Sequence, residues 1–228
     1  MSSTGCARSS TSQACSGPWP RCAGPRNKLV RAVTTRRLEA FSDGVFAIAA
    51  TLLILNVAVT GVKPLDRELI DIWPSYVAYA IAFLTIGVVW ANHHTVIDQC
   101  KQVNRLFLML NVIFLMLVAF FPFPTRLLAE NITTDGARAA AIAYGVTGAL
   151  TAVMFNVIWL YASGGGRLLR HDADARVVEG ITRSYLPGPL IYLAATLLAL
   201  VNPILSAAIF ALVPVFYVVE SSFFGTGG

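Results

Sequence analysis

Charged residues are scarce in this sequence. Asp, Glu, Lys and Arg make up 13% of its 228 residues and hydrophobic residues 56%, whereas about 25% of a soluble globular chain is charged. The charges stand in short blocks between long apolar runs, and these runs mostly lack the polar face of a soluble helix. The pattern favours a polytopic membrane protein over a large soluble core.

Catalytic motifs are also absent. The sequence contains no Gly-rich phosphate loop, no nucleophile elbow and no paired carboxylates within its apolar runs. Asp43 is the only acidic residue well inside a run, and Glu220 stands at the end of the last one. We therefore expect neither an enzyme nor a cofactor, and the scarcity of intramembrane charge argues against a proton-coupled transporter.

Residues 1–35 lack any long apolar run and are rich in Ser, Gly, Pro, Arg and Cys. Nothing in this segment has the hydrophobic core and small-residue cleavage site of a secretory signal. We expect a disordered cytosolic tail here and a short second tail over residues 222–228. Residues 36–221 then form one transmembrane domain, without a basic soluble face that would bind nucleic acid.

The remaining sequence is a series of apolar runs, each close to the ~20 residues that cross a hydrocarbon core as a helix. They predict an all-α fold with six transmembrane helices. Pro187, Pro189 and Pro214 fall within the last two runs, where we expect kinks rather than breaks. The runs cover residues 38–60, 73–94, 105–128, 137–162, 184–201 and 203–221.

Lys and Arg indicate the orientation of these helices. With six spans both termini lie on one side, and 13 of the 17 basic residues fall on that side, against 4 on the other. The positive-inside rule predicts that both termini are cytosolic, in a multi-pass protein of the cell membrane. All four cysteines then face the cytosol, where no disulfide is expected.

The first run carries a narrow, mostly aliphatic stripe. At 100° per residue it consists of Gly44, Ile48, Thr51, Leu52, Leu55 and Val59. On spacing alone, a seam for packing against another helix is the favoured interpretation. The alternative is a pore wall. Ile48, Leu52 and Leu55 would form stacked apolar rings that gate by dewetting, and Thr51 would add a ring of hydroxyls.

A carboxylate at the depth of Asp43 requires a partner or water. The second run ends and the third begins on the cytosolic side, so their polar residues meet the base of the first run. We expect an inter-helix network that fixes this base. Its members are Arg37, Ser42, Asp43, Asn92, His93, His94 and Asn104.

His93 and His94 raise the question of a metal site. Adjacent helical residues point about 100° apart and are poor co-ligands, whereas His94 and Asp98 can share a face. Two ligands are too few for a structural zinc site, so hydrogen-bonded histidines are the favoured interpretation. A membrane hydrolase with a metal held by His93, His94 and Asp98 is the weaker alternative.

Three motifs resemble one known family. Arg37 is followed by Phe41-Ser42-Asp43 and an aliphatic run. WANHH stands at residues 90–94, and FFPFPTRLL stands at residues 120–128. These motifs are similar to those of the transmembrane protein 175 family of potassium channels. The resemblance covers about residues 36–220 and leaves the tail outside. A single six-helix unit resembles the bacterial and archaeal branch, which implies a homotetramer whose first helices line the pore.

The resemblance also implies roles for individual residues. Ile48 matches the narrowest hydrophobic ring, Leu52 and Leu55 match further rings, and Thr51 matches the hydroxyl position implicated in ion preference. The signature that braces the first helix matches Arg37, Phe41, Ser42 and Asp43. Its expected bracing partners are Trp90, His93 or His94, and Asn104.

The expected function is therefore a potassium-selective or weakly selective cation channel with passive permeation. Its partners would be copies of itself, potassium ions and the lipid bilayer, and it would hold no metal. A secondary transporter of a small solute or ion is the alternative, although the sequence shows no helix broken at the midplane.

Overall fold

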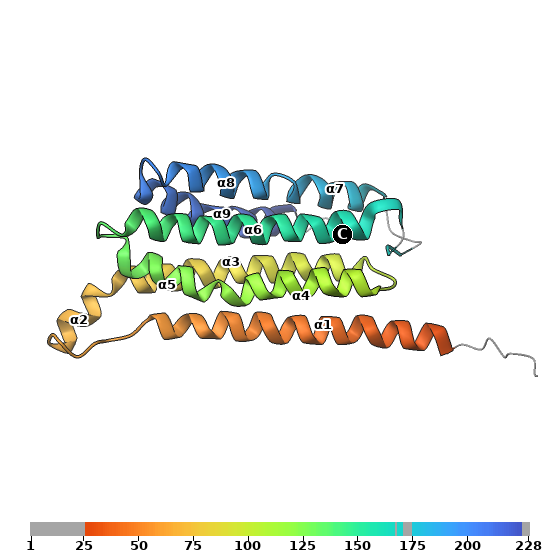
Figure 1. The fold of residues 1–228 in the computed structure, drawn as a ribbon, viewed down its shortest axis with the longest axis horizontal. Coiled ribbons are helices and arrows are strands. Elements are labelled where there is room, and N and C mark those ends of the chain that lie inside the picture. The colour runs from red at the N-terminus through yellow and green to blue at the C-terminus, as the bar shows by residue number, and fades with distance from the viewer. Residues whose placement is uncertain (1–25, 167, 171–174, 225–228) are drawn as a thin grey trace, which may run out of the picture.

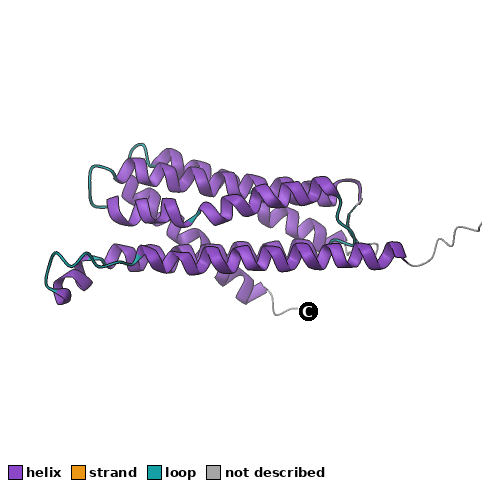
Figure 2. Ribbon diagram, turned by 60° about the horizontal axis from the view of Figure 1, so that its bottom comes forward, coloured by secondary structure: helices purple, strands orange, loops and turns teal. Residues whose placement is uncertain are grey.

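The computed structural model describes residues 26–166, 168–170 and 175–224. This part of the chain is helical, with one isolated β-bridge between Cys100 and Leu169 and no strand (Figure 2). The elements, in chain order, are α1 (Arg26–Leu52), the 3-10 turn η1 (Leu53–Asn56), α2 (Leu65–Asp71), α3 (Trp73–Asp98), α4 (Arg105–Phe120), α5 (Pro122–Asn131), α6 (Ala137–Ser163), the 3-10 turn η2 (Gly164–Gly166), α7 (Ala175–Tyr185), α8 (Gly188–Leu198) and α9 (Pro203–Phe224).

Four helical segments of the described chain are long and apolar enough to cross a membrane. They are Thr35–Asn56, Trp73–Asp98, Arg105–Asn131 and Ala137–Ser163. The apolar part of α9, Pro203–Val218, is shorter, and α8 has 11 residues. The all-α prediction and the first four spans are thus confirmed, while the count of six stays a prediction.

Helix α1 differs from the expected first span at both ends. It begins at Arg26, inside the segment that we assigned to the tail, and its last turn tightens into η1, which ends at Asn56. The Asn56 side chain donates to the Pro122 carbonyl over 3.1 Å, so the end of this span is tied to the start of α5. Residues 1–25 of the expected tail, and 225–228 of the C-terminal one, lie outside the described residues.

Proline determines where two of the later helices are interrupted. Helix α7 ends at Tyr185, and Pro187 precedes α8, so the expected kink in this span is a break between two helices. Proline supplies no N–H to the preceding turn, which allows the chain to restart there. Pro214, in contrast, stays inside α9 as expected. Pro122 opens α5 directly after α4.

Small residues allow α6 and α8 to pack closely, which is common between membrane helices. A Cβ atom at Gly145 would lie 2.1 Å from Thr196 Oγ1, and one at Gly148 would lie 2.5 Å from the Tyr192 ring. Neither site has room for a side chain. The glycines in residues 144–148 are therefore packing positions.

Helix α1 runs along one side of the bundle, next to α3 and α4 (Figure 1). The start of α1, the α3–α4 connection and the end of α6 lie at the same end of the bundle in this view. This agrees with the alternating path that the basic residues predict. The buried face of α1 and η1 includes Leu38, Ser42, Phe46, Ala49 and Leu53.

Candidate functional site

The opposite face of α1 carries the stripe found in the sequence, and it is exposed. Ile48 is 61%, Leu52 42% and Leu55 67% exposed, and Gly44 and Thr51 are exposed as well. Because α1 packs against α3 and α4 through its other face, the stripe is not a packing seam within this chain. Within the described part of the chain these large apolar side chains stay exposed, so they face the surroundings of the subunit.

Thr51 also lies on the exposed face. Its hydroxyl donates to the Ile48 carbonyl over 3.0 Å, one turn back along the same helix. A hydroxyl has one proton and two acceptor lone pairs. With the proton used inside the helix, the oxygen remains an acceptor for a group outside it.

Asp43 has a partner on α3. The Trp90 indole Nε1–H donates to Asp43 Oδ1 over 2.8 Å, which joins the two helices near their charged ends. The hydrogen bond satisfies the only donor of the indole and one oxygen of the carboxylate. The sequence placed both residues in the bracing network, and the structure brings them together.

His93 points into the core from a neighbouring face of α3. It is 2% exposed and lies 2.8 Å from Asn111 Oδ1 through Nε2. The Asn111 amide donates to the Phe107 carbonyl, so its oxygen accepts and His93 Nε2 carries the donated proton. The imidazole stacks on Phe114 with centroids 5.3 Å apart and contacts Phe46 of α1 at 5.6 Å.

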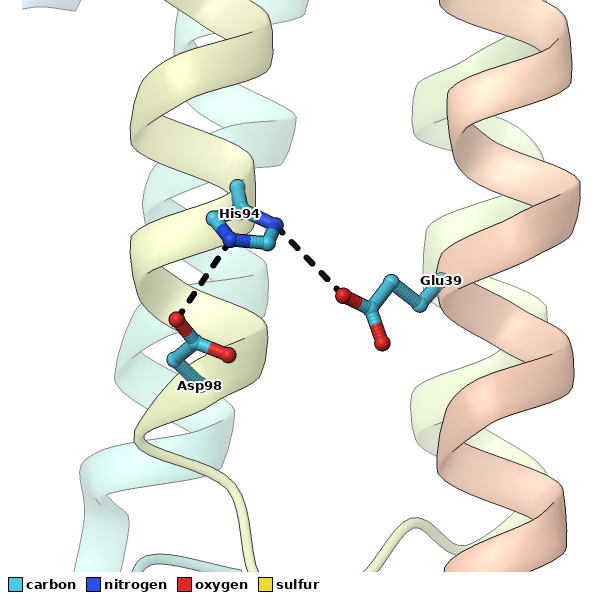
Figure 3. Close-up of side chains that lie close together, drawn as sticks. All are labelled: Glu39, His94 and Asp98. Carbon is cyan, nitrogen blue, oxygen red and sulfur yellow. Dashed lines mark ion pairs between the residues drawn. The ribbon is translucent and has the colours of Figure 1, made fainter.

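His94 faces α1 instead. Its Nδ1 lies 3.6 Å from Glu39 Oε1, and its Nε2 lies 3.5 Å from Asp98 Oδ2 (Figure 3). Since His93 is turned into the core, the two histidines and Asp98 do not form one metal centre. The hydrolase interpretation with these three residues is therefore wrong.

Glu39 and Tyr161 take part in these contacts although the sequence pattern did not point to them, and Glu39 lies in the layer between α1 and α3. Its position follows from the antiparallel pairing of α1 and α3. Glu39 and Asp43 are four residues apart on α1, and Trp90 and His94 are four apart on α3. Once Asp43 pairs with Trp90, the same faces bring Glu39 opposite His94.

The remaining network residues act within or beside their own helices. Ser42 is buried and donates to the Leu38 carbonyl over 2.8 Å, so it fills the interface without crossing it. Asn104 accepts from the Phe107 N–H at the start of α4 and donates to the Tyr161 hydroxyl of α6, each over 2.8 Å. Asn104 therefore braces α4 and α6 rather than α1.

Arg37 and Phe41 are exposed on α1. Arg37 makes no hydrogen bond or ion pair with another described residue. Asn92, which we expected at the same level, lines a cavity between α3, α6, α8 and α9 instead. The predicted single network is thus divided between a contact layer on α1 and α3, a buried cluster around His93, and a separate link through Asn104.

The two connections at this end of the bundle pair with each other. The Lys101 N–H donates to the Leu168 carbonyl over 2.8 Å, and the Arg170 N–H donates to the Gln99 carbonyl over 2.9 Å. Cys100 lies buried between them, and burial raises the pKa of its thiol to about 12. Its thiolate is therefore scarce at neutral pH.

Comparison with known proteins decides the family. The family described as "Endosomal/lysosomal potassium channel TMEM175" matches residues 37–122. A potassium channel of Chamaesiphon minutus is 39% identical over 193 residues, a region that covers 82% of this chain and 95% of that channel. The chain belongs to the TMEM175 family. TMEM175 proteins are ion channels, so the chain is a multi-pass membrane protein and not an enzyme.

Solved structures support the same fold. The crystal structure of the lysosomal potassium-selective channel TMEM175 homologue from Chamaesiphon minutus is 37% identical, with a TM-score of 0.76, and covers 83% of this chain and 98% of that one.

A more distant TMEM175 relative, the chicken protein described as an endosomal/lysosomal proton channel, is 36% identical over 114 residues. That region covers 45% of this chain and 23% of the chicken protein.

We predict that Trp90→Phe destabilises the protein by about 1 kcal/mol, because it removes the indole donor but keeps most of the ring. The measurement is thermal unfolding of the purified protein in detergent. Trp73→Phe is the control, since Trp73 is an exposed tryptophan on the same helix without a hydrogen bond to a described residue. Equal stability losses in both variants would show that the Asp43 hydrogen bond contributes nothing.

Proposed function

We propose that this TMEM175 protein forms a potassium-permeable channel of four identical subunits in the cell membrane, with both termini in the cytosol. Ions would cross passively along an axis lined by α1. The relative that supports this most is the Chamaesiphon channel, which is described as a potassium channel and is matched over almost its whole length.

The exposed stripe on α1 is the observation that carries this proposal. A transmembrane helix at the edge of a subunit, with one face packed and the other unpartnered, suits a position around a symmetry axis. Ile48 and Leu52 are four residues apart in the α-helix, and Leu52 and Leu55 three apart in the 3-10 turn, which is about 6 Å along the axis in each case. Four copies would form a hydrophobic section roughly 12 Å long.

Such a hydrophobic section would control ion permeation by excluding water from the ion path. Apolar rings narrow enough to expel water oppose the passage of hydrated ions, and polar groups among them reduce that cost. Thr51 lies one residue before Leu52, with its hydroxyl oxygen free to accept. We therefore propose that Thr51 oxygens contact the ion where its hydration is most disturbed.

The contacts of α1 with α3 and α4 hold the pore helix from behind. Asp43 and Trp90 link α1 to α3, while Phe46 packs against the stacked rings of His93 and Phe114. All of these contacts lie on faces turned away from the stripe. This division supports a rigid pore wall whose position depends on the bracing residues.

A transporter would give a different kinetic signature. Coupled transport is saturable and slow and needs a second solute, whereas passive flux follows the electrochemical gradient alone. The descriptions of TMEM175 relatives name both potassium and protons, so potassium and proton fluxes should be recorded separately.

We predict that Ile48→Asn raises ion flux by about tenfold, which corresponds to about 1.4 kcal/mol less barrier. An amide ring would keep water where the isoleucine ring expels it. The measurement is rubidium uptake into liposomes that contain the purified protein. Leu193→Asn, at an exposed position of α8, is the control. Unchanged flux in Ile48→Asn would contradict the pore position of Ile48.

A second prediction concerns ion preference. Thr51→Val keeps the shape of the side chain but removes the hydroxyl, and we expect the potassium-to-sodium permeability ratio to fall about three- to tenfold. Reversal potentials in planar bilayers give this ratio. Thr95→Val is the control, because Thr95 is also exposed and donates over 3.0 Å to a carbonyl of its own helix, that of Ala91. Equal ratios in wild type and Thr51→Val would exclude a role for this hydroxyl.

A further inference from the structure

Glu39, His94 and Asp98 form a cluster that the pore proposal does not use. Each residue offers one ligand atom, and the three atoms lie within 4.8 Å of one another. Glu39 comes from α1, while His94 and Asp98 are one turn apart on α3 (Figure 3). The side chains are 35%, 44% and 61% exposed, so an ion from solution can reach them.

The spacing of the cluster does not fit hydrogen bonds. The distances from the two His94 nitrogens to Glu39 and Asp98, 3.6 and 3.5 Å, exceed the usual range of about 2.7–3.2 Å. Either distance alone fits a nitrogen and an oxygen that share one metal ion. Two ligands bound at about 2.1 Å to one tetrahedral zinc are roughly 3.4 Å apart.

The imidazole is also held in place from behind. His94 stacks on the Trp90 indole with centroids 6.1 Å apart and an angle of 27° between the planes. Trp90 is in turn fixed by its hydrogen bond to Asp43. A ligand oriented in this way loses less rotational freedom on binding, which favours affinity.

We propose that Glu39, His94 and Asp98 bind a divalent transition-metal ion, with Zn²⁺ as the reference ion. The two ring nitrogens of His94 face different carboxylates, so a single ion binds only one of these nitrogens. Rotation of the Glu39 and Asp98 side chains would then bring both carboxylates to that ion. Water completes the coordination. Imidazole selects zinc, nickel or copper over magnesium and calcium, which prefer oxygen ligands alone.

The bound ion would join α1 to α3 directly beside the Asp43–Trp90 hydrogen bond. It would therefore act as a cross-link at the charged end of α1, and the position of this helix would depend on metal concentration. Metal binding is independent of whether α1 lines a pore, so the two proposals succeed or fail separately.

The test is a calorimetric titration of the full-length protein, with any affinity tag removed, in detergent. Zn²⁺ is added in the presence of excess Mg²⁺. We expect one site per subunit that is weakened at least about tenfold in each of Glu39→Gln, His94→Asn and Asp98→Asn. Zn²⁺ bound elsewhere, for example by Cys6, Cys15 and Cys22, contributes equally to every variant and cancels in the comparison.

Glu130→Gln is the control, because Glu130 is an exposed carboxylate paired with Arg126 at the other end of the bundle. It should bind Zn²⁺ as the wild type does. Zn²⁺ should also raise the unfolding temperature of the wild type and of this control, but not of the three cluster variants. Unchanged binding in all three variants overturns the proposal. So does a loss confined to His94→Asn, which would indicate a lone histidine ligand.

Discussion

The attachment of α1 to α3 and α4 is the interaction on which the rest of the molecule depends. Leu38, Phe46, Ala49 and Leu53 fill the interface, and the Ser42 hydroxyl is satisfied within its own helix. One hydrogen bond, from Trp90 to Asp43, crosses it at the charged end. Because these contacts use one face only, the other face keeps its large apolar side chains exposed.

The rotation of about 100° per residue in a helix explains why two adjacent histidines make different contacts. His93 and His94 point about 100° apart, so one enters the core and the other faces α1. His93 connects α3 to α4 through Asn111 and contacts Phe46, while His94 stands between two carboxylates. The polar residues at this end of the bundle therefore form separate groups, of which those around His93 and His94 contact α1 at different residues.

Much of this arrangement could be predicted from the sequence, because a lipid environment demands long apolar helices. The helices α3 and α6 and the membership of the stripe on α1 follow from run length and helical periodicity, whereas the exposure of the stripe does not, since spacing alone favoured a packing seam. The break before α8 does not, since Pro187 and Pro189 are compatible with a kink when neighbours satisfy the backbone. Glu39 and Tyr161 were missed because a partner on another helix depends on how the helices are aligned, which one sequence does not specify. The roles of Ile48, Thr51, Leu52 and Leu55 in permeation rest on the family resemblance and remain predictions.

We propose that copies of α1 surround the ion path with the stripe turned inward. The most direct measurement is a cryo-electron microscopy structure of the purified oligomer in a lipid nanodisc. We expect a fourfold axis with Ile48, Leu52 and Leu55 of all subunits facing it, and the Thr51 hydroxyl oxygens at the same radius. An oligomer in which these side chains face lipid, with another helix at the axis, would contradict it.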